Sequence, residues 1–335
     1  MTHQYVDRMS GSITTERMFG DRIVGFLYSN VRENAPALFR LLTHRRISNA
    51  LATANFDLPL GSALLGNRRF LRSCGVNLNE CAAAADELRT PRQIFERKIQ
   101  YWNCRPMPEE PDAAVCPADS RALVGSLRPG RMLFVKNKFF HYEELIGADC
   151  PWVNAFRGGD FCIFRLTPDK YHHTHTPVAG VVEQQYEVSG EYHSCNPAAL
   201  VEMVTPYSKN RRAVTIFQTD VRGGTSLGLV AMIEVVALMI GEIVQCYSEV
   251  EYENPRSIQA GMFIRKGCPK SLFRPGSSAV VLLFQKDRVE FAPDLVWNLY
   301  RFDAESRYTK GFQQPLVETD VQVRSLLARR AGASR

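Results

Sequence analysis

The 335-residue sequence has no cysteine pair at CxxC spacing and no long uncharged apolar run. Its nine cysteines are an odd number and lie scattered, which argues against a disulfide scaffold or a zinc ribbon. The most apolar stretch, residues 227–240, contains Glu234 and is followed by Gly241 and Glu242, so it is a poor candidate for a membrane-spanning helix. We also expect no secretory leader. We therefore expect a reduced, cytoplasmic protein that meets a membrane only peripherally, on the inner face.

Charge of one sign is not in large excess either, since 41 Lys and Arg stand against 35 Asp and Glu, a formal net charge of +6. A bias of this size suits an anionic membrane surface without requiring one. The basic residues Arg324, Arg329, Arg330 and Arg335 have no aromatic side chains between them, so a nucleic-acid interface is not favoured. We expect them to lie in a solvated terminal helix, within a basic tail of residues 321–335.

With 45% apolar and 23% charged residues, the composition is that of a folded globular protein. Residues 1–104 read as a helical N-terminal region. The alanine-rich stretch 81–88 has high helix propensity, and Thr90, followed by proline, is a helix start signal. The next helix would place Phe95 and Ile99 on one side. We expect this region to form a helical layer that covers a sheet.

Three prolines between residues 105 and 111 disfavour regular structure and mark a boundary. Beyond them, short runs of β-forming residues alternate with turns. These runs are residues 131–135, 161–166, 213–217, 243–246 and 280–284. The sequence therefore predicts an α+β fold class, with a mostly β catalytic domain over residues 105–320 and the N-terminal helical layer against it.

A Gly-Ser step, Gly276-Ser277-Ser278, precedes the apolar run 279–284. The Ser277 hydroxyl can attack the Gly276 carbonyl and convert the amide to an ester, provided that a base removes its proton and the turn is strained. Elimination from that ester would cut the chain and leave dehydroalanine, which hydrolyses to a pyruvoyl group. The ordinary alternative is that these three residues only form a turn before a strand.

Histidine is the natural base for a serine, and it works best when a carboxylate fixes its tautomer. His175 and Asp119 fit these two roles. His172, His173 and His175 offer two alternatives, a set of metal ligands or a solvated loop. In a strand, His173 and His175 would share one face while His172 points the other way, so a three-histidine metal site needs an irregular loop. We expect no metal.

The segment 156–180, with Tyr171, His172, His175 and Pro177, resembles the YHxxHxP region of the pyruvoyl-dependent phosphatidylserine decarboxylase family. Other segments resemble motifs of that family in the same order along the chain. They are residues 117–119 for its PADG motif, 135–147 for its lysine-to-LLG stretch, 210–212 for NER, 237–243 for GAxxVGSI and 276–278 for the self-cleaving GST or GSS.

This resemblance implies that Asp119, His175 and Ser277 form a self-cleavage triad, and that His172 assists decarboxylation or substrate binding. The cut would fall between Gly276 and Ser277. The pyruvoyl group derived from Ser277 would then be the cofactor, because its carbonyl forms a Schiff base with a substrate amine. The expected partners are phosphatidylserine or another amino-acid-containing substrate, an anionic membrane and the cleaved small chain. A homo-oligomer is left open.

The sequence departs from the family at several positions. Ser120 replaces the glycine that follows the aspartate of PADG, and Glu242 stands where VGSI has serine. Pro275 fixes its own φ, which either presets the scissile turn or blocks it. An apparent insertion, residues 266–271, precedes that turn.

The register of the strand after the Gly-Ser step makes Ser278 an alternative nucleophile. The family commonly places a phenylalanine six residues after its pyruvoyl serine, whereas Phe284 lies six residues beyond Ser278 and seven beyond Ser277. Ser277 is preferred here because Gly276 precedes it, and glycine tolerates the strained conformation.

Three functions remain open at this level. The leading one is decarboxylation of phosphatidylserine to phosphatidylethanolamine at a membrane. The second keeps the chemistry but acts on a soluble tryptophan-like or serine-containing amino acid, which lipid dependence of the activity would discriminate. The third is a non-processing relative that binds lipid or a partner, whose chain would stay whole when folded.

Overall fold

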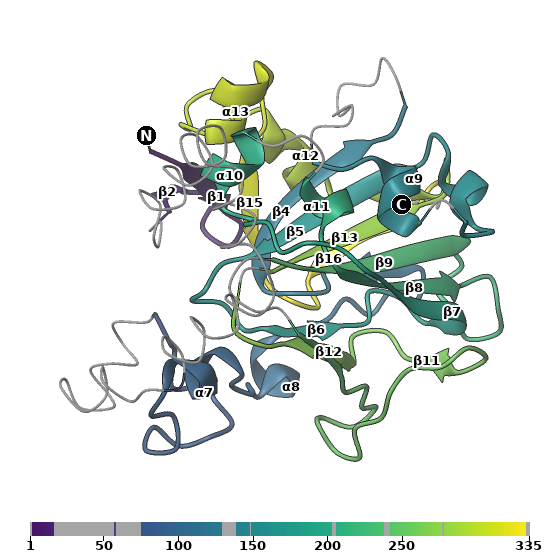
Figure 1. Cartoon of the computed structure of the whole chain (residues 1–335), viewed down its shortest axis with the longest axis horizontal. Coiled ribbons are helices and arrows are strands. Elements are labelled where there is room, and N and C mark those ends of the chain that lie inside the picture. The colour runs from purple at the N-terminus through teal and green to yellow at the C-terminus, as the bar shows by residue number, and fades with distance from the viewer. Residues whose placement is uncertain are drawn as a thin grey trace.

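The computed structural model describes residues 2–16, 57, 75–128, 139–147, 149–202, 206–237, 242–276 and 278–332 (Figure 1). The expected helices between residues 17 and 74, the expected strand 131–135 and Ser277 lie outside the described residues. Within the described residues, no helix is long and apolar enough to cross a membrane.

A ten-stranded sheet forms the core, in the order β11-β7-β8-β9-β13-β5-β4-β15-β1-β2. Its strands are β1 (Gln4–Asp7), β2 (Ile13–Thr15), β4 (Ser120–Ser126), β5 (Asp160–Leu166), β7 (Gly180–Val188), β8 (Arg212–Gln218), β9 (Leu229–Val236), β11 (Phe263–Ile264), β13 (Ser278–Phe284) and β15 (Glu318–Val321). Neighbouring strands are antiparallel, except that β1 pairs with β15 in parallel. The expected mostly β architecture is confirmed.

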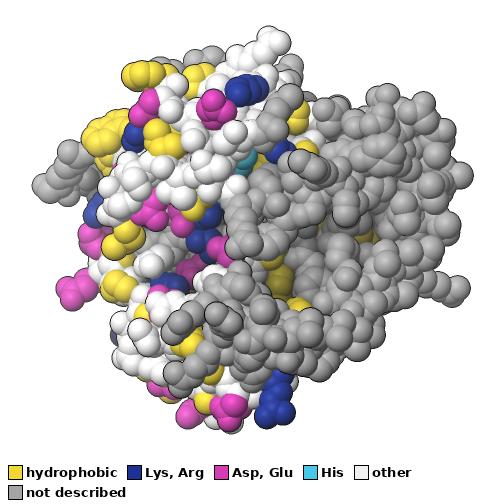
Figure 2. Space-filling view, turned by 90° about the vertical axis from the view of Figure 1, so that its left-hand side faces the viewer, with side chains coloured by type: hydrophobic (Ala, Val, Ile, Leu, Met, Phe, Trp, Pro, Cys, Tyr) yellow, Lys and Arg dark blue, Asp and Glu magenta, His cyan; other side chains and the backbone are white. Residues whose placement is uncertain are grey.

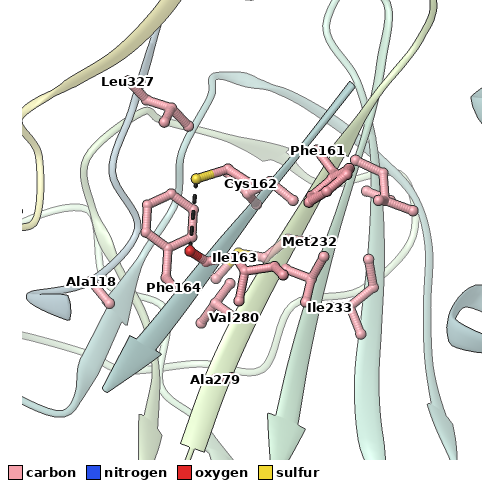
Figure 3. Packing of buried hydrophobic residues seen from close by; sticks show 14 of the residues in the cluster. Ala118, Phe161, Cys162, Ile163, Phe164, Met232, Ile233, Ala279, Val280 and Leu327 are labelled. Carbon is pink, nitrogen blue, oxygen red and sulfur yellow. Dashed lines mark hydrogen bonds between the residues drawn. The ribbon is translucent and has the colours of Figure 1, made fainter. Parts of the chain in front are cut away.

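Strand β13 lies in the middle of this sheet and is buried along its whole length. It pairs with β5 on one edge and β9 on the other, over all seven residues. A strand covered on both faces needs a continuous apolar run, which the stretch Ala279–Phe284 supplies. Figure 3 shows Val280 packed among Phe164 of β5 and Met232 of β9. The predicted strands 161–166, 213–217 and 280–284 are thus confirmed.

Two small sheets and several short helices complete the described structure. The small sheets run β10-β12-β6 and β14-β16-β3. Their strands are β3 (Ala113–Val115), β6 (His173–His175), β10 (Ile243–Gln245), β12 (Pro269–Phe273), β14 (Val289–Phe291) and β16 (Leu326–Arg330). The helices are α7 (Pro91–Phe95), α8 (Tyr101–Cys104), α9 (Tyr142–Ile146), η2 (Val153–Phe156), α10 (Pro197–Glu202), α11 (Pro206–Lys209), α12 (Pro293–Leu299) and α13 (Arg307–Phe312). In Figure 1, α12 and α13 lie above the large sheet, and β6, β12, α7 and α8 lie below it.

The expected helix over residues 81–88 is wrong. These residues form turns, and Cys81 makes an isolated antiparallel bridge with Ile99. Helix α7 does begin after Thr90, in a capping box with Gln93, but it ends at Phe95. Helix propensity is a weak preference, and here the packing of Cys81 into a small apolar cluster outweighs it. The described N-terminal residues therefore contain two strands, turns and two short helices rather than a clear helical layer.

The expected terminal helix is also wrong, because the C-terminal segment is built into the sheets. Strand β15 pairs with β1 and β4, and β16 pairs with β3 and β14. Leu327 and Ala328 are fully buried, so this segment supplies core residues as well as exposed arginines. The division of the chain at residues 104/105 and 320/321 stays a prediction.

A buried charged network ties the N-terminal strands to this C-terminal segment. The Arg165 guanidinium donates to both carboxylate oxygens of Glu16, at 2.9 and 2.5 Å, and to both of Glu318, at 3.0 and 2.6 Å. His3 donates from Nε2 to Glu318 at 2.8 Å, because its Nδ1 accepts from the Arg307 amide. One arginine therefore binds two buried carboxylates from opposite ends of the chain, and Arg121 lies 3.9 Å from Glu16.

We expect Arg165→Met to destabilise the protein by about 3–5 kcal/mol, because it leaves the buried Glu318 and Glu16 carboxylates without the guanidinium that bonds both. Arg301→Met is the matched control, since its partner Asp303 is exposed and an exposed ion pair contributes little to stability. Equilibrium unfolding in guanidinium chloride measures the free energy of unfolding of both variants. Equal effects of the two variants would contradict this account of the network.

Candidate active site

Four strands of the large sheet bring the candidate residues to the same end. Strands β4 and β13 begin there, and β5 and β9 end there, because each is antiparallel to its neighbour. Ser278, the first residue of β13, pairs with Leu166 of β5 and with Val236 of β9. Asp119 directly precedes β4, two strands away from β13, which corresponds to about 10 Å. The fold thus gathers residues that are far apart in the sequence.

Asp119 is held as a buried carboxylate. Arg105 donates from Nε to Oδ1 at 3.0 Å and from a terminal nitrogen to Oδ2 at 2.7 Å, and the Val323 amide donates to Oδ1 at 2.7 Å. Burial raises the pKa of Asp119, but the Arg105 guanidinium and these hydrogen bonds outweigh burial and place the pKa below its ordinary value. Asp119 is therefore ionised at neutral pH.

His175 lies beside Asp119, since its amide donates to the Pro117 carbonyl at 2.7 Å. Its Nδ1 is 2.9 Å from the Gly267 carbonyl, which can only accept, so Nδ1 carries the proton. Nε2 is then the acceptor, and the Tyr171 hydroxyl donates to it at 3.0 Å. We expected Asp119 to fix this tautomer. Among the described residues, the Gly267 carbonyl does so instead, and Asp119 makes no hydrogen bond to His175.

His172 and His173 are buried without partners for their polar atoms. The His172 ring stacks on Phe95, with 3.4 Å between centroids, and the His173 ring stacks on Tyr171 at 5.2 Å. Within the described residues, no ring nitrogen of either histidine lies in good hydrogen-bond geometry to a partner, although the Lys170 backbone approaches His172. Burial lowers the pKa of His172 and of His175 to about 3. These rings are neutral at pH 7, and the free nitrogens of His172 can bind a polar group that enters the site.

The residues around the Gly-Ser step are described on both sides of Ser277, which itself lies outside the described residues. Gly276 has φ of 151°, a conformation that side-chain-bearing residues rarely adopt. Ser278 is 1% exposed, and its Oγ has no hydrogen-bond partner among the described residues. A buried hydroxyl without a partner is costly, which makes this atom a candidate for chemistry.

The family's glycine is not required at Ser120 in this chain. Ser120 begins β4 and is not among the described residues with positive φ, and its hydroxyl donates to the Ala118 carbonyl at 3.1 Å. Of the other resembling segments, Asn210 holds the end of β9, because its amide group donates to the Val236 carbonyl at 2.9 Å.

The metal alternative finds no support in the ring geometry. Both nitrogens of His175 are engaged in hydrogen bonds, so a metal would have to displace the Tyr171 hydroxyl from Nε2. Within the described residues, the group with ligand atoms close enough for a metal is His3, Glu16 and Glu318. There the Arg165 guanidinium already occupies both carboxylates.

Several partners in this site were missed from the sequence. Arg105 carries no motif signal, and its role depends on a contact with Asp119 across 14 residues. Tyr171 stood within the quoted YHxxHxP segment without an assigned role. Tyr252, whose hydroxyl is 2.8 Å from that of Tyr171, has no local signal.

Comparison with known proteins decides the family. Residues 92–298 match the family model described as phosphatidylserine decarboxylase. The chain belongs to the phosphatidylserine decarboxylase family. This family consists of carboxy-lyases, and the resemblance seen in the sequence is confirmed.

Relatives of this decarboxylase family match over most of the chain. A "phosphatidylserine decarboxylase proenzyme" of Chlamydia trachomatis serovar L2 is 29% identical over 87% of this chain and 90% of its own length. The protein of the same name in Ruminiclostridium cellulolyticum is 26% identical over 88% of this chain and 91% of its own. That of Bordetella petrii is 31% identical over 67% and 78%.

We expect the buried histidines to stay neutral until the pH falls well below 6.5, because burial depresses the pKa of each in the folded state. The unfolded chain takes up these protons near pH 6.5, so their contribution to stability is complete above that pH and is lost as the pH falls toward 3. Imidazole ¹⁵N spectra against pH measure the charge directly. Titration of all seven histidines between pH 6 and 7 would contradict the buried arrangement.

Proposed function

We propose that this chain is a self-processing phosphatidylserine decarboxylase, which converts phosphatidylserine to phosphatidylethanolamine with a pyruvoyl group made from its own serine. The relatives named phosphatidylserine decarboxylase proenzyme support both the substrate and the precursor state. The observation that carries the proposal is the meeting of Asp119, His172, His175 and Ser278 at one end of the large sheet.

Self-cleavage would begin with attack of a serine Oγ on the carbonyl carbon before it, with His175 receiving the serine proton. The Tyr171 hydroxyl donates to Nε2 of His175. The serine proton therefore reaches the ring either by relay through this hydroxyl or after the hydroxyl moves away. The peptide C–N bond breaks and an ester forms. Loss of the serine α-proton then expels the new carboxylate and leaves dehydroalanine, which water converts to a ketone with release of ammonia.

Two adjacent serines are candidates for this nucleophile. Ser277 follows Gly276, whose unusual φ supports a strained scissile turn. Ser278 is supported by its buried, unpartnered Oγ and by the six-residue spacing to Phe284. We propose Ser278 on the strength of that hydroxyl, with Ser277 as the alternative, and the masses of the products distinguish them.

The described residues fit a pyruvoyl group at this end of the sheet. Among the described residues the buried nitrogens of His172 lack partners there, and an added carbonyl or substrate carboxylate can satisfy them. A pyruvoyl group supplies a carbonyl that takes up a substrate amine and accepts the electrons released with carbon dioxide. Neutral His172, stacked on Phe95, would orient the substrate or hold a proton in a site from which burial excludes water.

The proposal includes peripheral contact with an anionic membrane on its cytoplasmic, inner face. The net charge of +6 supports attraction to such a surface. On the face in Figure 2, the described Lys and Arg side chains lie among Asp and Glu side chains. The support therefore comes from net charge and the lipid substrate, not from a basic patch on that face.

The mass of the purified protein under denaturing conditions, with and without phenylhydrazine, tests the proposal. We expect two chains, of which the shorter begins at residue 278 or 277 and gains the mass of the hydrazone. Addition of phosphatidylserine vesicles should then release carbon dioxide. A folded protein that remains one unreactive chain would instead indicate a non-processing relative, and turnover of free amino acids alone would indicate a soluble decarboxylase.

Variants separate the roles of the site residues. His175→Ala should leave one uncut chain, because it removes the proposed base, and Asp119→Ala should do the same, because the Asp119 charge raises the pKa of His175 and so favours its uptake of the serine proton. His172→Ala should cut normally but decarboxylate at least about 100-fold more slowly, a usual contribution of one acid or base. Gel analysis of cutting and carbon dioxide release measure the two steps. Normal cutting in His175→Ala would remove that residue from the role of base.

A further inference from the structure

A fully buried ion pair lies beneath the candidate active site. Lys270 Nζ is 2.5 Å from Glu234 Oε2, and both side chains are 0% exposed. Glu234 interrupts an otherwise apolar strand, β9, whose other seven residues are buried hydrophobic side chains. Desolvation of two charges costs free energy, and apolar residues of similar size often stabilise a core as well or better. Stability alone therefore does not explain this pair.

The pair belongs to a polar cluster, the Glu234 cluster, which consists of Glu234, Lys270, Thr174 and Ser271. Glu234 Oε1 accepts from the Thr174 hydroxyl at 2.7 Å and from the Ser271 hydroxyl. The two hydroxyls are 2.6 Å apart. Thr174 lies in β6, and Lys270 and Ser271 lie in β12. The carboxylate of one strand of the large sheet thus fastens two strands of the small sheet.

The cluster lies next to the start of β13, to His175 and to the segment that leads into the scissile turn. Glu234 pairs with Val280 and Val236 pairs with Ser278, so Glu234 and Ser278 are diagonal neighbours on one face of the sheet, about 7–8 Å apart. Thr174 stands directly before His175 in β6. Strand β12 ends three residues before Gly276, so Lys270 and Ser271 anchor the segment that leads into the scissile turn.

We propose that Glu234 and Lys270 are positioning residues for self-cleavage, an inference that rests on the proposed function. The Glu234 carboxylate holds β6 and β12 in a fixed position relative to β13. It thereby positions His175 and the scissile turn relative to the attacking serine. Lys270 neutralises the carboxylate, so the cluster adds no net charge beside the attacking hydroxyl. A misplacement of about 1 Å can slow such a reaction by about 10²-fold.

The apolar double variant Glu234→Leu with Lys270→Met separates positioning from stability. It replaces both charges and should melt at or above the temperature of the wild type. We expect its conversion to two chains, followed by gel after cell-free synthesis, to be about 100-fold slower than that of the wild type. The matched control is Glu305→Leu with Lys310→Met, which removes an exposed ion pair outside the site and should cut at the wild-type rate.

A second pair of variants keeps the test decisive if the double variant fails to fold. Thr174→Ser retains the hydroxyl that bonds Glu234 and should cut normally, whereas Thr174→Val is nearly isosteric and removes it. We expect the valine variant to cut at least about 10-fold more slowly with a similar melting temperature. Wild-type cutting in a folded double variant, or equal cutting by the serine and valine variants, overturns the inference. A wild-type chain that stays whole overturns the proposed function itself.

Discussion

The structure depends on the pairing of β13 with β5 and β9. This strand is bonded along both edges over seven residues and is buried on both faces, so its first residue is held at the end of the large sheet. The same pairing places Ser278 near Asp119 and the histidines. It also means that a chain cut just before β13 still carries the central strand of the sheet. The short product cannot leave without breaking two complete ladders and the apolar core around them.

Burial governs the charges at this end of the sheet. Asp119 stays ionised because Arg105 pairs with it, whereas the three neighbouring histidines stay neutral because burial lowers the pKa of each. A neutral His175 with its proton on Nδ1 presents a lone pair at Nε2, as a base requires. The Glu234 cluster completes the pattern, since its carboxylate is matched by a buried ammonium. Asp119 and Glu234 therefore each have a counter-charge, and the described atoms without a hydrogen-bond partner include those of His172, His173 and Ser278.

How far the sequence predicted this arrangement depended on how local each signal was. The apolar runs of β5, β8 and β13, and the capping signal at Thr90, act over a few residues and were predicted correctly. The alanine-rich turns at 81–88 and the terminal strand β16 were not, because tertiary contacts override propensity there. The site shows the same division. The motifs pointed to Asp119 and His175, while their partners Arg105 and Gly267 come from other segments and became visible only when the chain was folded.

The most direct test of the account is mass spectrometry of one preparation of the wild-type protein under native and under denaturing conditions. The account predicts one particle with the mass of both chains in native buffer, and two separate chains after denaturation, the shorter beginning at residue 277 or 278. A single covalent chain of 335 residues after denaturation, from protein shown to be folded, would contradict it.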